Sequence, residues 1–382
     1  MRRRSYRRSP RATARAGILA LFVLLALLLL LGGRTLNISL PVISGINGTS
    51  GINGINGIDN VPGSSQCQSN CTVGSGAQGV RVFVEPEAGD SAITGAISGA
   101  TKSVWLEIYL LTDRNVISAL QDAAQRGIDV RVMLEPHPVG GGGSPQSTLA
   151  ELSAAGAKTE TTDPAFPLTH EKGMIIDSKT AFIMTTNFTR SALGGSSGSS
   201  GTTNREYDIV DTIPQDVQAV SAIFQADWNR TSPHINDPNL VVSPFNSRND
   251  FIALLNSARH TLIVEAEEMQ DSGIEQALIN AAKHGVSVEV ILPSPGGSSG
   301  DSNSQGIDVI KSGGVQVRED TRLYMHAKII VVDGRKAFVG SENISTQSLD
   351  QNRELGILVS DSGVLNTLQQ TFQQDWRDSQ AV

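Results

Sequence analysis

The chain repeats itself at an interval of about 157 residues, and this duplication restricts its fold more than any other feature. The glutamates Glu107 and Glu265, for example, stand at matching places, 158 residues apart. Such an interval is too long for a solenoid repeat and suits a duplicated domain. We therefore expect two core-forming halves, residues 80–232 and residues 233–382.

Each half begins with the same predicted order of strand, helix and strand. Alternating apolar residues indicate the strands, and apolar residues at helical spacing indicate the helices. Strand–helix–strand order implies right-handed crossovers between parallel strands, so the predicted class is α/β. The predicted elements are residues 103–107, 116–126 and 128–134 in the first half, and 261–265, 274–284 and 286–292 in the second.

A polar motif of the form HxKxxxxD occurs once in each half. Given the composition of this chain, one chance match is expected in roughly 1% of such sequences, and two matches are far rarer. Each half also carries an asparagine ten residues after the aspartate and, further on, an Asn-Arg-Glu triplet. These residues are His170, Lys172, Asp177, Asn187 and Glu206 in the first half, and His326, Lys328, Asp333, Asn343 and Glu354 in the second.

Strand geometry indicates which of these side chains can act together. A histidine and a lysine two residues apart on a strand leave the same face. Asp177-Ser178 and Asp333-Gly334 are turn signals, which predict that each strand folds back as a hairpin. A four-residue turn would place each lysine opposite a hydroxyl residue and each histidine opposite an asparagine. The predicted pairs are Lys172 with Thr185, His170 with Asn187, Lys328 with Ser341 and His326 with Asn343.

The acidic residues of the motifs then fall into two groups. Asp177 and Asp333 would lie at the hairpin tips, far from the lysines, so we expect structural roles for them. Glu206 and Glu354 are better candidates to bind the far nitrogen of each imidazole and to fix its tautomer.

Two imidazoles and two ammonium groups brought together are suited to a phosphodiester. The lysines and asparagines would neutralise and orient the non-bridging oxygens. One imidazole would attack phosphorus, while the other would protonate the leaving oxygen and then activate water. This chemistry requires no metal or other cofactor, and the sequence shows no clustered set of acidic ligands.

This constellation resembles the phospholipase D superfamily, in which two HxKxxxxD motifs are each followed by GSxN. The second copy fits in full with residues 340–343, whereas the first has Met-Thr-Thr-Asn at residues 184–187. The resemblance covers residues 80–382 and implies two α/β/α units related by a pseudo-twofold axis, with the site at their interface. It implies that His170 is the nucleophile and His326 the acid and base. Thr185 and Ser341 are expected to support phosphate binding.

The resemblance implies a phosphodiesterase that hydrolyses or transfers phosphatidyl groups through a phosphohistidine intermediate. A cardiolipin-synthase-like phosphatidyltransferase and an endonuclease are alternatives that the same site permits, and a degenerate scaffold is a further one that two intact motifs disfavour. The first 34 residues carry eight arginines and no acid, so the other 348 carry 22 basic and 38 acidic groups, a net charge of −16. A negative body disfavours nucleic acid and leaves a phospholipid as the expected partner. The two halves of one chain suffice for the site, whatever its oligomeric state.

The N-terminal segment is expected to be a membrane anchor. Residues 17–33 contain no polar side chain and follow the arginines, which suits a short transmembrane helix or the apolar core of a cleaved signal peptide. In both cases the arginines would stay in the cytoplasm and the body would lie outside it.

Residues 35–79 are expected to form a flexible linker, with glycine at every third position from residue 45 to residue 57. Cys67 and Cys71 could close a small disulfide loop in an oxidising compartment or remain unrelated thiols. Three glycine-rich or serine-rich runs, at residues 140–143, 194–201 and 296–300, predict loops.

Overall fold

The computed structural model describes residues 73–139, 143–194, 203–295 and 302–382. The predicted anchor or signal, both cysteines and most of the linker and of the three glycine-rich or serine-rich runs lie outside the described residues. Within the described residues, no helix is both long enough and apolar enough to cross a bilayer.

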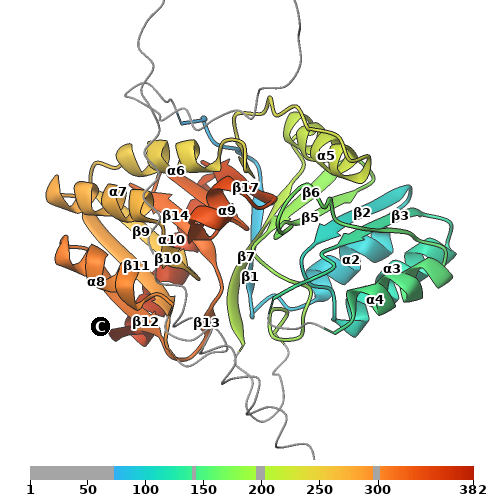
Figure 1. Ribbon diagram of the computed structural model, residues 1–382, viewed down its shortest axis with the longest axis horizontal. Coiled ribbons are helices and arrows are strands. Elements are labelled where there is room, and N and C mark those ends of the chain that lie inside the picture. Colours follow the sequence, from blue (N-terminus) through green and yellow to red (C-terminus); the bar gives the residue numbers. More distant parts are fainter. Residues whose placement is uncertain (1–72, 140–142, 195–202, 296–301) are drawn as a thin grey trace, which may run out of the picture. The chain divides into compact units, whose positions relative to one another are not determined.

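The first half is built on a mixed sheet with the strand order β1-β7-β6-β5-β2-β3-β4 (Figure 1). Helices α2, α3 and α4 cover one face of this sheet and helix α5 packs on the other. The strands are β1 (Arg81–Glu85), β2 (Ser103–Ile108), β3 (Asp129–Leu134), β4 (Lys158–Thr161), β5 (Lys172–Ile176), β6 (Thr180–Met184) and β7 (Asn204–Asp211). The helices are α2 (Ser91–Gly99), α3 (Arg114–Gln125), α4 (Pro145–Ala154) and α5 (Pro214–Trp228).

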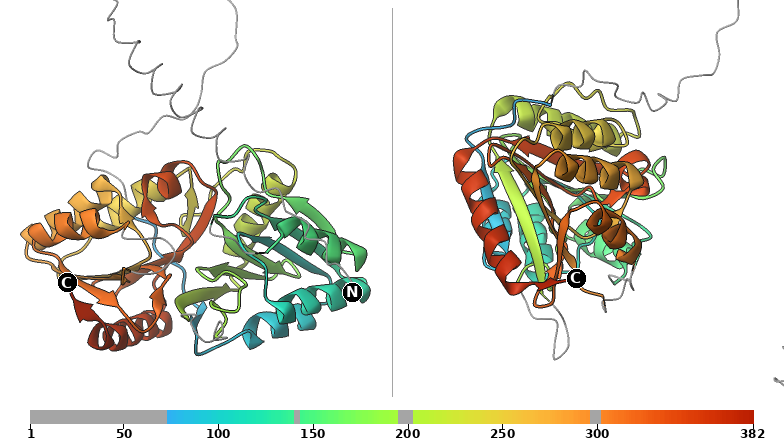
Figure 2. Two further views of the ribbon diagram at one scale, coloured as in Figure 1. Left: turned by 60° about the horizontal axis from the view of Figure 1, so that its bottom comes forward. Right: turned by 90° about the vertical axis from the view of Figure 1, so that its left-hand side faces the viewer.

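The second half repeats this plan with the order β18-β12-β11-β9-β14-β15-β17-β8. Helices α6, α7 and α8 lie on the outer face, at the opposite end of the body from α2 to α4 (Figures 1 and 2). The strands are β8 (Leu240–Ser243), β9 (Thr261–Ala266), β11 (Ser287–Pro293), β12 (Gln316–Asp320), β14 (Lys328–Val332), β15 (Lys336–Gly340), β17 (Glu354–Val359) and β18 (Gln380–Ala381). The helices are α6 (Ser247–Asn256), α7 (Ser272–Lys283), α8 (Ser304–Ser312), α9 (Thr346–Asp350) and α10 (Ser362–Asp378). The short strands β10 (Met269–Gln270) and β16 (Ile344–Ser345) pair with each other.

The central strands carry apolar residues on both faces, so each half has three layers: outer helices, a sheet, and a helix on the other face of that sheet. On β5, Met174 and Ile176 contribute to the core under the outer helices, while Ile175 between them points into a central core. On β14, Ile329 enters the same central core and Ile330 the outer core of the second half. Because the central core draws on both sheets and on α5 and α10, it packs the two halves against each other.

The predicted duplicated α/β fold is present, and the predicted elements agree with β2, α3, β3, β9, α7 and β11 to within about two residues. Helix α3 begins where the carboxylate of Asp113 accepts hydrogen bonds from two backbone amides, and Asp271 does the same for α7. Both helices end before a glycine with a left-handed backbone, Gly127 and Gly285. The sheets are mixed, because β5 and β14, the strands that carry the motifs, run antiparallel to β2 and β9.

The predicted hairpin register is wrong by one residue. Ile176 pairs with Thr180 and Val332 with Lys336, so each turn has three residues instead of four. The tighter turn is possible because its first two residues adopt left-handed backbone conformations; the first of these is Asp177 in one half and Asp333 in the other.

The predicted linker also extends too far. The backbone of Ala77 exchanges hydrogen bonds with Leu358 and Ser360, which extends the edge of β17. Ala77 is buried in the central core, so the ordered body begins several residues before the predicted boundary at residue 80.

The two motif aspartates lie at the hairpin tips and hold backbone amides. Asp177 accepts hydrogen bonds from the amides of residues 101 to 103 and from the hydroxyl of Thr101, and Asp333 accepts from the amides of residues 259 to 261. Burial acts to raise the pKa of Asp177, but these hydrogen bonds outweigh it and lower the pKa to about 2.

Replacing Asp177 by asparagine should therefore destabilise the fold by about 1–2 kcal/mol and leave the turnover of the folded protein unchanged. Because the folded pKa is depressed, the stabilisation is complete above the unfolded pKa of about 3.9 and is lost as the pH falls towards 2. Urea unfolding at pH 7 and pH 3 measures it, with Asp122→Asn on the exposed side of α3 as control. A large loss of turnover at unchanged stability would instead make Asp177 a functional residue.

Candidate active site

Each histidine strand begins beside the Asn-Arg-Glu strand of the other half. The short strand β13 (Tyr324–Met325) pairs in parallel with Asn204 and Arg205 at the start of β7. In the reciprocal place, the amide of His170 donates to the carbonyl of Arg353 at 2.9 Å. The residues at the start of each motif therefore form backbone hydrogen bonds or strand pairs with the opposite half.

This crossing joins each imidazole to a carboxylate of the opposite half. Nδ1 of His170 lies 3.0 Å from Oε2 of Glu354, and Nδ1 of His326 lies 2.8 Å from the Glu206 carboxylate. Both glutamates are fully buried and the histidines are less than one-tenth exposed. A carboxylate at Nδ1 keeps a proton on that nitrogen, so Nε2 is the atom that reacts, unprotonated in a nucleophile and protonated in an acid.

The charges around the His170–Glu354 pair perturb both groups. Burial and the charge of Lys172 lower the pKa of His170, and the Glu354 carboxylate acts in the opposite direction. Burial acts to raise the pKa of Glu354, but His170 and Lys172 outweigh it and lower the pKa. His170 therefore favours its neutral form, which a nucleophile requires, beside an ionised Glu354.

The two lysines converge from opposite halves. Nζ of Lys172 donates to the carbonyl of His170 at 2.5 Å, and Nζ of Lys328 donates to the carbonyl of His326 at 2.7 Å. Burial and the positive charge of Lys328 lower the pKa of Lys172 to about 7. The charge of Lys328 therefore acts on Lys172 across the interface between the halves.

Asn187 and Asn343 follow β6 and β15 in loops and not in the predicted strand register. Both are buried, and their Oδ1 atoms have no hydrogen-bond partner among the described residues. Nδ2 of Asn343 lies 3.5 Å from Glu267, which also contacts Lys328. The asparagine of the second half thus lies near its lysine, but the loop and not hairpin pairing brings it there.

The predicted phosphate-supporting hydroxyls lie elsewhere than we expected. Thr185 and Ser341 are fully buried, and their oxygens accept from the backbone amides of the next strand, β7 or β17. The Thr185 hydroxyl donates to Glu206 at 2.7 Å. In the other half the corresponding donor to Glu354 is Ser348, at 2.6 Å, which no motif indicated. These hydroxyls bind backbone amides and the two glutamates, so they hold in place the groups that position the histidines.

The arginines of the two Asn-Arg-Glu triplets form a second pair of crossed contacts. Arg205 of the first half binds Asp375 of the second through Nε at 2.6 Å and Nη2 at 3.0 Å. Arg353 of the second half binds Asp227 of the first at 2.8 Å. Asp227 and Asp375 each precede a tryptophan near the end of their half. Each aspartate holds the strand that carries the histidine-binding glutamate of the opposite half.

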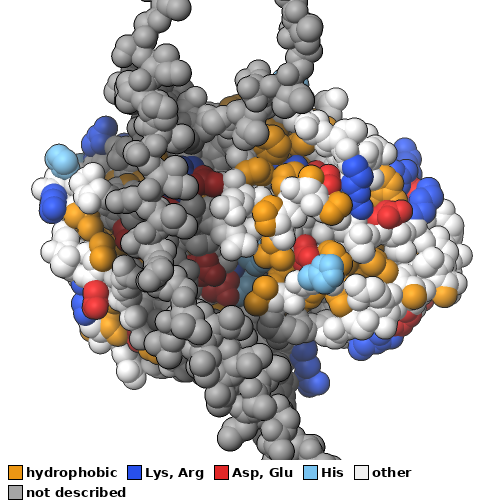
Figure 3. Space-filling model, viewed as in Figure 1, with side chains coloured by type: hydrophobic (Ala, Val, Ile, Leu, Met, Phe, Trp, Pro, Cys, Tyr) orange, Lys and Arg blue, Asp and Glu red, His pale blue; other side chains and the backbone are white. Residues whose placement is uncertain are grey.

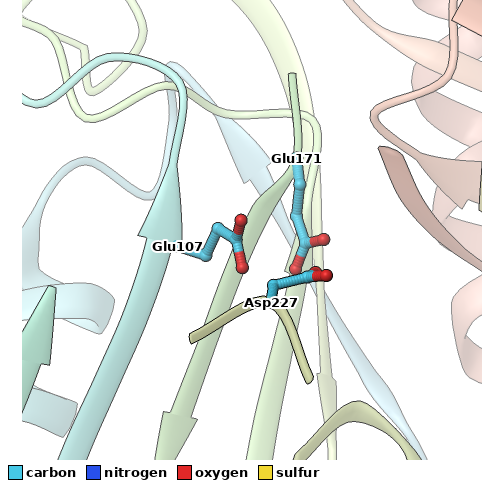
Figure 4. Close-up of side chains that lie close together, drawn as sticks. All are labelled: Glu107, Glu171 and Asp227. Carbon is cyan, nitrogen blue, oxygen red and sulfur yellow. The ribbon is translucent and has the colours of Figure 1, made fainter. Parts of the chain in front are cut away.

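Three buried carboxylates meet beneath the first-half motif: Glu107, Glu171 and Asp227 point toward one another (Figure 4). Their oxygens lie within 4.8 Å, so the sequence-based expectation of no clustered acidic ligands is wrong. Burial raises the pKa of Glu107, that of Glu171 to about 8 and that of Asp227 to about 6. Protonated carboxyl groups that hydrogen-bond to one another and to the Asp227–Arg353 pair would satisfy this cluster, and a hard cation is the other group that such oxygens suit.

Two further side chains enter the site at matching positions of the repeat, 158 residues apart, where the two halves share no motif. The ring of Tyr109 meets His170 edge-on with centroids 4.8 Å apart and lies 5.3 Å from Nζ of Lys172. Glu267 stands at the same place in the second half. In the space-filling view, acidic side chains gather beside a histidine near the centre of the face shown (Figure 3).

A family model described as "Cardiolipin synthase, PLD-like domain" matches residues 93–228 and 251–376, together more than half of the chain. The chain belongs to the phospholipase D superfamily. The two matched stretches are the two halves of the fold, and each contains one complete HxKxxxxD motif.

Proteins named as cardiolipin synthases match most of the chain. Cardiolipin synthase B of Salmonella typhi is 26% identical over 326 residues, which cover 74% of this chain and 76% of the relative. A cardiolipin synthase of Clostridium perfringens is 24% identical over 324 residues, covering 73% of this chain and 66% of the relative. The solved structure of the phosphatidylserine synthase of Haemophilus influenzae has the same fold, with a TM-score of 0.62 at 14% identity, covering 80% of this chain and 88% of that one.

Proposed function

We propose that this chain is a phospholipase D-type phosphatidyltransferase, which moves a phosphatidyl group from one glycerophospholipid to the hydroxyl of an alcohol. The observation that carries the proposal is the convergence of two His–Lys pairs on one site, each histidine held by a carboxylate of the other half. Relatives named as cardiolipin synthases favour transfer to an alcohol over hydrolysis.

In the first step, Nε2 of His170 attacks phosphorus while the bond to the leaving alcohol breaks. His326 donates the proton on its Nε2 to the departing oxygen, and Lys172 and Lys328 bind the non-bridging oxygens. In the second step, the acceptor hydroxyl gives its proton to His326 and attacks phosphorus, which breaks the P–N bond and restores His170. Glu354 and Glu206 hold the imidazoles throughout and stabilise the charge that develops on each.

Water can take the acceptor's place in the second step, so hydrolysis is the competing outcome of the same intermediate. A membrane anchor at residues 1–34 would hold the site beside its lipid substrate and concentrate acceptor lipids. Both effects favour transfer between lipids over release of phosphatidic acid.

Product analysis tests the proposal. The full chain in detergent micelles with phosphatidylglycerol alone should form diphosphatidylglycerol and free glycerol in equal amounts, and EDTA should not change the rate, because two imidazoles supply the nucleophile and the acid. Phosphatidylcholine with added glycerol should yield phosphatidylglycerol. Phosphatidic acid as the only product under both conditions would make the chain a hydrolase, and cleavage of DNA without reaction on lipid would overturn the proposal.

A further inference from the structure

Glu267 reaches into the second-half donor set directly after β9. Its Oε2 lies 2.8 Å from Nζ of Lys328, and 3.5 Å from both Nε2 of His326 and Nδ2 of Asn343. Its Oε1 accepts a hydrogen bond from the hydroxyl of Tyr324 at 2.9 Å. The three donors that would hold a phosphate oxygen in this half thus surround a carboxylate of the protein itself.

The first half differs at the matching position. Tyr109 stands there, and its uncharged ring lies against Lys172 and His170. The two donor sets, near-identical in sequence, are therefore unequal in charge: Lys328 is paired with an anionic side chain inside the site, while the neighbour of Lys172 is neutral. The HxKxxxxD motifs do not report this asymmetry, because positions 109 and 267 lie outside them.

A carboxylate oxygen and a phosphate oxygen accept the same hydrogen bonds, so a phosphate oxygen that takes this position competes with Glu267 for these donors. Glu267 is about one-fifth exposed, which gives its side chain room to turn aside when substrate enters. Once displaced it still lies close to the phosphate, and its repulsion grows with the charge of the bound anion. A phosphodiester carries one negative charge, whereas inorganic phosphate and phosphomonoesters carry close to two near pH 8.

We propose that Glu267 is a specificity residue, which occupies the second-half phosphate subsite in the free protein and selects monoanionic phosphodiesters against dianionic phosphates. The inference rests on the proposed function, since it assigns this subsite to the phosphate of the substrate. It would allow the enzyme to work in the presence of free phosphate and of phosphatidic acid, both of which offer the same oxygens with more charge.

Calorimetric titration of the full chain at pH 8 tests this, with inorganic phosphate and dimethyl phosphate as probes. Glu267→Gln should bind inorganic phosphate roughly tenfold more tightly than the wild type, with a clearly smaller gain for dimethyl phosphate. Adding Lys328→Met to Glu267→Gln should remove the gain. Glu268→Gln, which removes the same charge one residue further along, should change the affinity less than twofold.

Three results would overturn the inference: unchanged or unmeasurable phosphate binding in Glu267→Gln, an equal gain for both probes, or a gain that survives Lys328→Met. The titration needs no turnover. A chain that binds as expected but transfers no phosphatidyl group would therefore contradict the proposed function and leave the subsite assignment standing.

Discussion

Replacing His170 or His326 by alanine should reduce phosphatidyl transfer by roughly 10³-fold or more, with little change in stability. His170 supplies the atom that bonds to phosphorus, and His326 supplies and recovers the proton, so neither step proceeds at a useful rate without both. The rate of product formation from phosphatidylglycerol measures the loss. The double variant should be little slower than either single variant, because the two side chains act in one sequence of steps.

His234→Ala is the matched control for these variants, because His234 is an exposed histidine in the segment between the halves. It should keep the full rate. If either motif variant retained more than about one-tenth of the activity, the two-histidine mechanism would be wrong.

Replacing Glu354 by glutamine should lower the turnover rate by roughly 10- to 100-fold and should perturb His170, although the two residues belong to opposite halves. Glu354 raises the pKa of His170 against the effect of burial, so its loss should lower that pKa further. Glu206→Gln should reduce turnover similarly through His326 but leave the titration of His170 nearly unchanged.

An NMR pH titration of the His170 ring in the wild type and the two variants separates these effects. Glu171→Gln is a demanding control, since Glu171 adjoins His170 in sequence but its carboxylate points to the buried acidic cluster (Figure 4). If Glu206→Gln shifted His170 and Glu354→Gln did not, the pairing would run within each half, against the crossed arrangement.

Most of the fold that could be predicted, namely two α/β halves with matching elements, followed from the duplication in the sequence. Asp113 and Asp271 begin matching helices and Gly127 and Gly285 end them, so local chemistry alone positions these elements in both halves. The hairpin register was wrong because turn length depends on backbone angles at Asp177 and Asp333 that no side-chain pattern reports.

The motif residues of the candidate site were predictable, but their pairing was not. Sequence spacing places His170 near residues of its own half, whereas its carboxylate partner comes from 184 residues further on, across the interface between the sheets. Glu267 was missed because it departs from the repeat, with Tyr109 as its counterpart, and a repeat draws attention to what is shared. The buried cluster around Glu107 was missed because its members are far apart in the sequence.

The central claim is that one site, assembled from both halves, transfers a phosphatidyl group through His170. The most direct measurement incubates the full chain with phospholipid labelled at phosphorus, quenches the reaction and follows the label on the protein. The stability of the bound label to acid and to alkali then identifies the linkage. A label that is stable to alkali and labile to acid, as a P–N bond is, should appear on His170 in the wild type and be absent from His170→Ala. It should accumulate in His326→Ala, in which transfer of the phosphatidyl group from His170 to an alcohol is blocked after a slow first step. Label on the His170→Ala protein, or transfer with no protein-bound label in any variant, would contradict the account.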